Sequence, residues 1–414
     1  MSSVPLRRNR DFMLLQSGQL LSTFGSRVSA IAYPLLVLAV TGSAAKAGLV
    51  GAAEFTPLLL FNLPAGVVAD RFDRRRLMIM ADVVSAASVG TLAALVLTHN
   101  ASFWTILVIA FVDATGGVFF RAGQTGAFRS VVPLEQLPAA ASLAQARGAT
   151  VLLTAPPVGG ALFGLARGLP FLVDALSYVF STVSVLLMRT RFQEERVGDT
   201  APLRKQLAEG LSFLSHVPFL RTTMLMIAAS NFSTTGVQLA VIVLAKRQGL
   251  SSATIGAFVA LVGVTALLGA VASPLLRRFF SLHTILLSEF WAGVVYAPFF
   301  IWPNAYVLAV AFAVQAFCFP NTDSAVAAYW YALTPDRLVG RVMSVSSTLR
   351  VLAVPFGPLA AGLLLSSVSS RVTIAVFTGW TLAAAVVGTF SSSIRSAPRL
   401  EDLVTPAASP AEAG

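Results

Sequence analysis

Ten ionisable side chains lie inside long apolar segments of the sequence, where a charge is costly and therefore marks a candidate functional site. Such groups can carry a proton or bind a charged ligand. Asp82 and Asp174 fall near the ends of their segments, and we interpret them as structural. The group with candidate roles in proton coupling or in lining a substrate cavity is Arg27, Glu54, Asp113, Arg121, Glu289 and Asp323.

The composition explains why these charges are unusual. Of the 414 residues, 56% are apolar and 11% are charged, and the mean hydropathy is +0.79. An average soluble domain carries about 25% charged residues, so this composition excludes a soluble enzyme and a disordered chain. The single cysteine, Cys318, excludes an intramolecular disulfide framework and a cysteine-based zinc cluster. A polytopic membrane protein remains.

The apolar residues fall into twelve segments, each long enough for a spanning helix of about 20 residues. We therefore predict an all-α polytopic membrane protein with 12 transmembrane helices in two pseudo-symmetric six-helix bundles. The expected spans are 12–41, 45–69, 76–97, 103–130, 138–165, 170–189, 220–245, 252–276, 282–301, 304–332, 337–367 and 371–393.

The basic residues predict the orientation of these spans. With the N-terminus inside, twenty lysines and arginines fall on the inner side and five on the outer side. An excess of basic residues in cytoplasmic loops is the rule for membrane proteins. We expect both termini in the cytoplasm, and we attribute the net charge of +11 to this topology rather than to nucleic-acid binding.

The longest polar stretch divides the chain near its middle. We predict an N-terminal six-helix bundle at 1–189, a cytoplasmic linker at 190–219, a C-terminal bundle at 220–393 and a disordered cytoplasmic tail at 394–414. Leucines at helical spacing in the linker predict an amphipathic helix on the inner membrane face, or a packed linker helix without a role of its own. The halves resemble each other around 131–165 and 333–365, which is typical of transporters built from parallel repeats.

The loop between the second and third spans reads Gly66-Val-Val-Ala-Asp70-Arg71-Phe-Asp73-Arg74-Arg75-Arg76. It resembles the GxxxDRxGRR signature of the major facilitator superfamily (MFS), with Asp73 in place of the second glycine. This resemblance implies the MFS fold and a cytoplasmic gate. Asp70 is expected to meet the positive N-terminal end of the helix at 337–367; simple positive-inside anchoring is the alternative. The gate residues are Gly66, Asp70, Arg71, Asp73, Arg74 and Arg75.

Two proline and glycine elements extend this resemblance. Spans five and eleven contain Ala155-Pro-Pro-Val-Gly-Gly160 and Gly357-Pro-Leu-Ala-Ala-Gly362, which resemble the GPxxGG element of MFS antiporters. With Arg121-Ala-Gly-Gln124, they resemble the drug:proton antiporter-3 branch, which includes macrolide-efflux and siderophore-export proteins. We predict a bendable seam between helices, with ordinary enrichment of these residues as the alternative. The seam residues are Pro156, Pro157, Gly159, Gly160, Gly357, Pro358 and Gly362.

The buried charges suggest how transport could be driven. We expect Arg27 to pair with Glu54 or Asp113, because an arginine at the centre of a span needs a partner. Burial favours the neutral acid and a nearby arginine favours its charged form, so a carboxylate that exchanges this partner can carry a proton. The alternative is a permanent ion pair. A weaker hypothesis pairs Arg121 with Asp323 across the two halves.

Several chemistries find no support in the sequence. There is no phosphate-binding loop, no histidine cluster with metal-ligand spacing and no G-x-S-x-G element, so we expect no enzyme, no metal and no cofactor besides the coupling proton. Apolar side chains could line a substrate cavity. The aromatic candidates are Phe55, Phe61, Phe119, Phe232, Trp291, Phe317, Tyr329 and Trp330.

These observations predict a proton-coupled exporter in the bacterial cytoplasmic membrane. The expected substrate is a lipophilic or amphiphilic small molecule such as a drug, a siderophore or a secondary metabolite. The alternatives are a lysophospholipid carrier, a facilitator or importer of a small nutrient, and a membrane scaffold or sensor that transports nothing. We expect membrane lipids around a monomer and no nucleic-acid partner.

Overall fold

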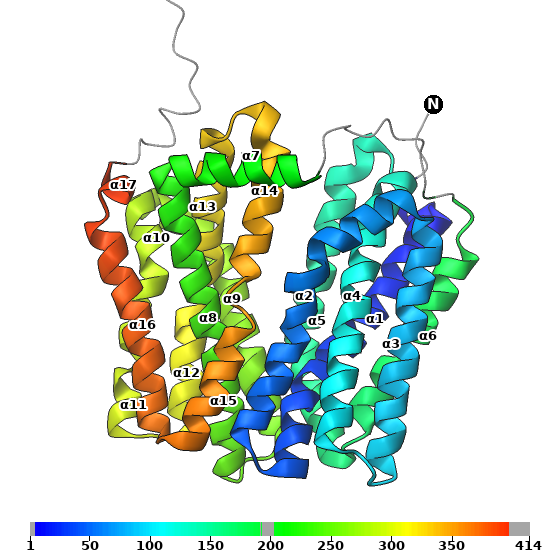
Figure 1. The fold of residues 1–414 in the computed structure, drawn as a ribbon, viewed down its shortest axis with the longest axis horizontal. Helices are drawn as coiled ribbons and strands as arrows, with labels where there is room; N and C mark the ends of the chain where they lie inside the picture. The colour runs from blue at the N-terminus through cyan, green and yellow to red at the C-terminus, as the bar shows by residue number, and fades with distance from the viewer. Residues whose placement is uncertain (1–4, 191, 193–202, 397–414) are drawn as a thin grey trace, which may run out of the picture.

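The computed structural model describes residues 5–190, 192 and 203–396, and all regular secondary structure in this part of the chain is helical. Its first half contains α1 (Arg10–Thr41), α2 (Ala44–Arg71), α3 (Arg74–Leu97), α4 (Phe103–Val131), α5 (Leu137–Leu165) and α6 (Leu169–Leu187), with short 3-10 helices η1 (Leu6–Arg8) and η2 (Leu134–Gln136). α7 (Leu203–His216) joins it to the second half (Figure 1).

The second half also forms six spans, but three of them are composed of shorter helices. They are α8 (Pro218–Arg247), α9 (Ser252–Phe279), the group α10 (Leu282–Trp291), η3 (Ala292–Tyr296) and α11 (Ala297–Ile301), the pair α12 (Ala305–Ala316) and α13 (Phe319–Leu333), the pair α14 (Asp336–Val351) and α15 (Phe356–Ser367), and α16 (Ser370–Phe390). α17 (Ser392–Arg395) follows. The twelve expected spans are confirmed as helices of sufficient length and hydropathy to cross a membrane.

Proline accounts for where these spans break. A proline lacks the N–H that an interior helical position requires, so it is tolerated best in the first turn of a new helix. Pro320 stands in the first turn of α13, Pro298 in that of α11, and Pro355 immediately precedes α15. In contrast, α5 runs without interruption through Pro156 and Pro157.

Polar side chains fix the ends of several spans. The Asn9 and Ser43 side chains accept hydrogen bonds from backbone N–H groups in the first turns of α1 and α2, and Ser102 forms a capping box with Thr105 at the start of α4. α1 ends at Gly42, whose φ of 67° is a left-handed conformation that glycine adopts readily. These caps satisfy backbone groups that the helices leave unpaired at their ends.

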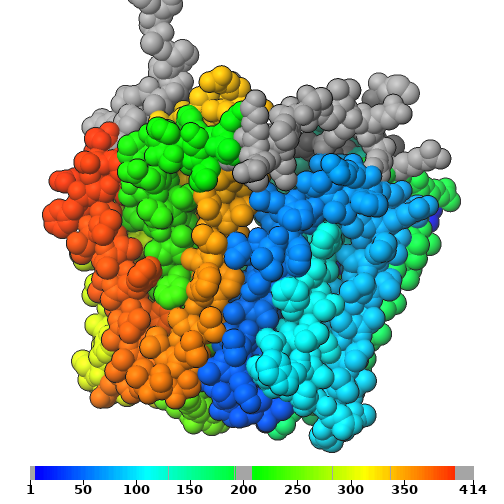
Figure 2. Space-filling view, viewed as in Figure 1, coloured from blue at the N-terminus to red at the C-terminus, as the bar shows by residue number. Residues whose placement is uncertain are grey.

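The helices form two bundles that lie side by side (Figure 1). We call the end that carries η1 and α17 the terminal face, and the end that carries Gly42 the opposite face. The bundles meet where α2 packs against α15 and where α5 packs against α9. Figure 2 shows the first of these contacts from outside, as α15 lies directly against α2.

Glycines allow the two bundles to approach to backbone contact near the opposite face. A Cβ atom on Gly48 of α2 would lie 2.5 Å from the Pro358 carbonyl oxygen of α15. A Cβ atom on Gly160 of α5 would lie 2.2 Å from the Ser252 carbonyl oxygen of α9. Both distances are shorter than a carbon–oxygen contact permits, so side chains at these positions would push the bundles apart.

The linker helix α7 crosses the terminal face over the C-terminal bundle (Figure 1). It packs on α14 and α8: Leu214 is buried, and Glu209 forms an ion pair with Arg341. Part of the predicted linker thus forms a helix, in which Leu211 remains half exposed. Residues 193–202 of the linker, and the predicted tail from residue 397 on, lie outside the described residues. Ile394 and Arg395 of that tail belong to α17.

Candidate functional site

A polar cavity of about 360 Å³ lies inside the N-terminal bundle. It brings together four of the six charged residues that the sequence analysis singles out: Arg27 from α1, Glu54 from α2, and Asp113 and Arg121 from α4. Two groups of opposite charge that share one cavity can exchange partners and protons. Asp82, which we interpreted as structural, also lines this cavity.

Asp113 is held by tyrosine hydroxyls rather than by an arginine. Tyr178 of α6 donates a hydrogen bond to Asp113 Oδ1 at 2.8 Å, and Tyr33 of α1 donates to Oδ2 at 3.4 Å. The Tyr178 hydroxyl also lies 2.9 Å from Ser26 Oγ. Ser26 in turn donates to Asp174, so hydroxyl groups connect the two buried carboxylates.

Asp174 is fully buried between α1 and α6 and accepts hydrogen bonds from serine hydroxyls. Its partners are Ser26 and Ser29 of α1 and Ser177 of its own helix. A buried carboxylate without such partners would be strongly destabilising. The helices α1 and α6 also pack closely here, because a Cβ atom on Gly25 of α1 would lie 2.2 Å from Ser177 Oγ of α6.

The expected pairing of Arg27 with Glu54 or Asp113 is not formed in this structure. No carboxylate of the described residues lies within 4.0 Å of the Arg27 or Arg121 guanidinium. The expected pairing of Arg121 with Asp323 is also wrong for this structure, because Asp323 forms an ion pair with Arg350 of its own bundle. Asp323 of α13 and Arg350 of α14 belong to the same bundle, whereas Arg121 lines the cavity of the other bundle.

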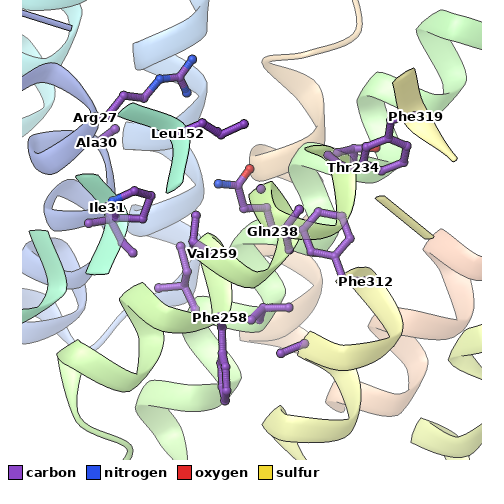
Figure 3. A pocket seen from close by; sticks show the side chains of 17 residues that line it. Arg27, Ala30, Ile31, Leu152, Thr234, Gln238, Phe258, Val259, Phe312 and Phe319 are labelled. Atoms are coloured by element: carbon purple, nitrogen blue, oxygen red, sulfur yellow. The ribbon is translucent and has the colours of Figure 1, made fainter. Parts of the chain in front are cut away.

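A second cavity of about 290 Å³ lies between the two bundles, and its walls are mostly apolar (Figure 3). α1 and α5 contribute Arg27, Ile31 and Leu152 on one side. α8, α9, α12 and α13 contribute the other side. The polar residues of that side are Thr234 and Gln238, and its aromatic residues are Phe258, Phe312 and Phe319.

Arg27 and Ala30 line both cavities, so α1 is the common wall between them. A third cavity of about 360 Å³ shares Leu58, Val118 and Arg121 with the polar one. This third cavity is lined on its other side by Gly66, Asp70 and Arg74 of the α2–α3 region. A series of cavities with shared walls therefore leads from the terminal face to the bundle interface.

The gate residues are held mainly within the α2–α3 region. Arg74 donates to Asp70 Oδ1 at 3.1 Å and to the Phe192 carbonyl oxygen at 3.2 Å. Asp73, which stands where the MFS signature has glycine, accepts a hydrogen bond from the Arg76 N–H and thereby caps α3. Arg75 donates to the Leu186 carbonyl oxygen, while Arg71 is exposed.

The remaining candidates lie in the C-terminal bundle, apart from this cavity series. Glu289 of α10 is buried and accepts a hydrogen bond from Ser230 of α8. Gln315 donates to the Glu289 carbonyl oxygen at 3.2 Å and accepts from the Tyr296 hydroxyl at 2.6 Å. The structure thus separates Glu289 and Asp323 from the other four charged candidates.

The seam residues lie at close helix contacts. Pro156 lines the apolar cavity, and its carbonyl oxygen would lie 2.4 Å from a Cβ atom on Gly256 of α9. Pro157 is adjacent to it at the same contact. Gly159 approaches the Val28 carbonyl oxygen, Gly357 that of Phe232, and Gly362 that of Ala44. These positions are therefore sites of close backbone packing, between the bundles for α5–α9 and α2–α15.

The sequence analysis missed the hydroxyl partners of the carboxylates and both polar residues of the apolar cavity. A signal for the first group exists, because Ser22, Ser26, Ser29 and Tyr33 recur at helical spacing on one face of α1. No comparable signal marks Thr234 and Gln238. Among the described residues, no group of three His, Cys, Asp or Glu side chains could hold a metal ion.

Two six-helix bundles with a cavity between them are the architecture of a multi-pass membrane protein of the MFS class. The family described as transmembrane secretion effector (MFS_3) matches residues 2–406, and the chain belongs to this family.

Curated relatives are efflux proteins. The multidrug efflux pump Tap of Mycobacterium tuberculosis is 30% identical over 52% of this chain and 53% of that protein. Tap of Mycolicibacterium fortuitum is 26% identical over 92% of this chain and 96% of that protein. Macrolide efflux protein A of Streptococcus pyogenes is 25% identical over 49% and 51%. The chain thus spans about half the length of the M. tuberculosis and S. pyogenes relatives that it matches.

Solved structures agree on the fold. A bacterial homologue of the iron transporter ferroportin in an inward-facing state gives a TM-score of 0.74 at 19% identity and covers 93% of this chain and 99% of that chain. A bacterial homologue of the lysosomal transporter Spinster, also inward-facing, gives 0.73 at 17% identity and covers 98% of this chain and 100% of that chain.

Proposed function

We propose that the protein is a proton-coupled exporter of lipophilic or amphiphilic small molecules in the bacterial cytoplasmic membrane, with both termini in the cytoplasm. The observation that carries this proposal is the common wall at Arg27 and Ala30. It separates an apolar cavity that suits such a substrate from a polar cavity that contains the carboxylates. The efflux relatives support export as the direction.

In this proposal, Glu54 or Asp113 carries the proton, and Arg27 responds to the charge of that carboxylate. A protonated carboxylate leaves Arg27 without a counter-charge, and a deprotonated one attracts it. Glu54 has no hydrogen-bond partner among the described residues, whereas Asp113 has two tyrosines. Glu54 is therefore the carboxylate that can change partner with the smaller rearrangement, and we favour it as the carrier.

The polar cavity and the third cavity supply a route for the proton from the terminal face. Arg121 lines both, and Asp70 and Arg74 stand at the far end. Opening and closing of the α2–α3 region would then control access to this route. The bundles pack backbone to backbone near the opposite face, which fits a state that is closed on that side.

Inverted membrane vesicles provide the test. A panel of amphiphiles is added to energised vesicles, and proton release is followed with a pH-sensitive dye. We expect an active compound to collapse the gradient in vesicles with the wild-type protein, and the response to fall at least tenfold with Glu54→Gln. Asp113→Asn shows whether the second carboxylate contributes. Glu135→Gln is the matched control, because Glu135 is exposed and lies outside all three cavities.

Two outcomes would contradict the proposal. If no compound moves protons while labelled substrate is still transported, coupling to protons is wrong. If Glu54→Gln and Asp113→Asn both retain full proton movement, the driving ion does not pass through these carboxylates. A lysophospholipid in the panel separates the alternative lipid carrier, which would transport that compound and none of the others.

A further inference from the structure

We infer that the apolar cavity between the bundles takes amphiphiles that carry an anionic group, and that Arg27 recognises the anion. This inference rests on the proposed function, because it names the substrate class of the same cavity. The anionic group is a carboxylate, sulfonate or phosphate attached to an apolar body.

The first reason is the uncompensated charge of Arg27. Its side chain is exposed to the cavities and lies more than 4.0 Å from every carboxylate of the described residues. Arg121, the other arginine on the wall of the polar cavity, is exposed in the same way and adds a second positive charge. Arginine stays charged in proteins, and an unpaired guanidinium inside a membrane is costly. An anionic ligand would offset this cost.

The second reason is the placement of two further polar groups across the cavity. Thr234 and Gln238 of α8 lie on the wall that faces Arg27 (Figure 3). Neither side chain has a hydrogen-bond partner among the described residues. An amide and a hydroxyl can donate to oxygen atoms of a ligand, so the polar groups of both bundles converge on the same space.

The third reason is what the cavity lacks. No aspartate or glutamate is among the residues that line it, so a cationic compound would meet Arg27 without a counter-charge. The remaining walls come from aliphatic and aromatic side chains such as Ile31, Leu152 and Phe258, which suit an alkyl or aryl body. Its volume of about 290 Å³ is near the lower limit of ligand pockets, so the body is small or partly outside.

Three probes with the same dansylaminoundecyl body test the assignment. They end in a carboxylate, a carboxamide or a trimethylammonium group. Binding to the purified full-length protein in phosphatidylcholine nanodiscs is measured by dansyl fluorescence. We expect the carboxylate to bind at least tenfold more tightly than the other two, because hydrogen bonds to charged groups are stronger than neutral ones.

Substitutions then assign the effect to one residue. Arg27→Gln should remove the preference for the carboxylate and leave carboxamide binding unchanged, and Arg27→Lys should restore part of it. Arg278→Gln is the control, because Arg278 is an exposed arginine outside all of these cavities. If Arg27→Gln fails to fold, the comparison of the three probes on the wild-type protein still shows whether the cavity prefers an anionic group.

The outcomes separate this inference from the proposed function. Equal binding of the three probes, tighter binding of the cation, no binding of any probe, or an equal loss of all probes with Arg27→Gln would overturn it. Charge-selective binding without proton-coupled transport would support the inference and contradict the proposed function. Addition of phosphatidylglycerol to the nanodiscs shows the source of the anion: weaker probe binding assigns the site to an anionic lipid, and unchanged binding assigns it to a free solute.

Discussion

At the scale of single residues, Tyr178 joins the hydrogen-bond partners of the two buried carboxylates. Its hydroxyl donates to Asp113 and lies within hydrogen-bond distance of Ser26, which in turn contacts Asp174. Two carboxylates that are far apart in the sequence therefore share one chain of hydroxyl groups.

Tyr178→Phe should destabilise the protein by about 1–3 kcal/mol, because it leaves buried Asp113 without its shortest hydrogen bond. Tyr33→Phe is the matched control, since Tyr33 donates to the same carboxylate at 3.4 Å and should have a smaller effect. Unfolding of the purified variants in detergent measures both. Equal losses of unfolding free energy in the two variants would show that the hydrogen-bond geometry around Asp113 does not determine the stability of the protein.

The sequence identifies the charged residues but not their partners. Depth within an apolar segment is a property of the sequence, so Arg27, Glu54 and Asp113 stand out immediately. Which face of which helix they meet depends on how the helices pack. Arg27, Glu54 and Asp113 do line one cavity, but the expected Arg27 pairing is not formed in this structure, and Asp113 accepts hydrogen bonds from Tyr33 and Tyr178 instead.

At the scale of helices, close backbone packing at glycines joins the two bundles. Gly160 of α5 lies against Ser252 of α9, and Gly164, one turn further along α5, has no heavy atom within 4 Å of its Cβ position. These two glycines differ in environment but belong to the same helix. They form a controlled pair for substitution.

Gly160→Ala should weaken the contact between α5 and α9 and lower the stability of the described state by about 1–3 kcal/mol, because a methyl group would overlap the Ser252 carbonyl oxygen. Gly164→Ala should have no such effect. Thermal unfolding and the transport rate are the measurements. If Gly160→Ala leaves both stability and transport unchanged, α5 and α9 can move apart enough to accommodate the methyl group, and the prediction is wrong.

Hydropathy predicts the helices well, because spans of about 20 apolar residues are a strong signal. The breaks are harder to predict. Pro355 and Pro320 stand where new helices begin, whereas Pro156 and Pro157 do not interrupt α5. Proline interrupts a spanning helix only where neighbouring helices leave the freed carbonyl groups another partner or space, and that information is tertiary.

At the scale of the whole molecule, the two bundles can move as units because few elements connect them. The largest contacts between them are α2–α15 and α5–α9, near the opposite face, and α7 packs on α14 and α8 of the C-terminal bundle. A transporter of this architecture exposes its central cavity to each side in turn. Distances at the two faces should therefore change in opposite directions.

Spin labels can detect this motion in a Cys318→Ser background. One pair, at Glu135 and Arg278, spans the terminal face, and another, at Asn100 and Trp302, spans the opposite face; all four residues are exposed. During transport, the distance of the first pair should shorten while that of the second lengthens. Changes in the same direction, or none, would contradict rocking of two rigid bundles.

The two interfaces near the opposite face also bear on the time course of that motion. Span two contacts span eleven, and span five contacts span eight, so the internal repeat makes each contact the counterpart of the other. Both rely on backbone atoms that have no flexible side chain between them. Separation of the helices at one contact would also displace the helices at the other contact. Intermediates in which only one of the two contacts is broken are therefore disfavoured. Single-molecule traces should show abrupt switching between two levels instead of a gradual drift.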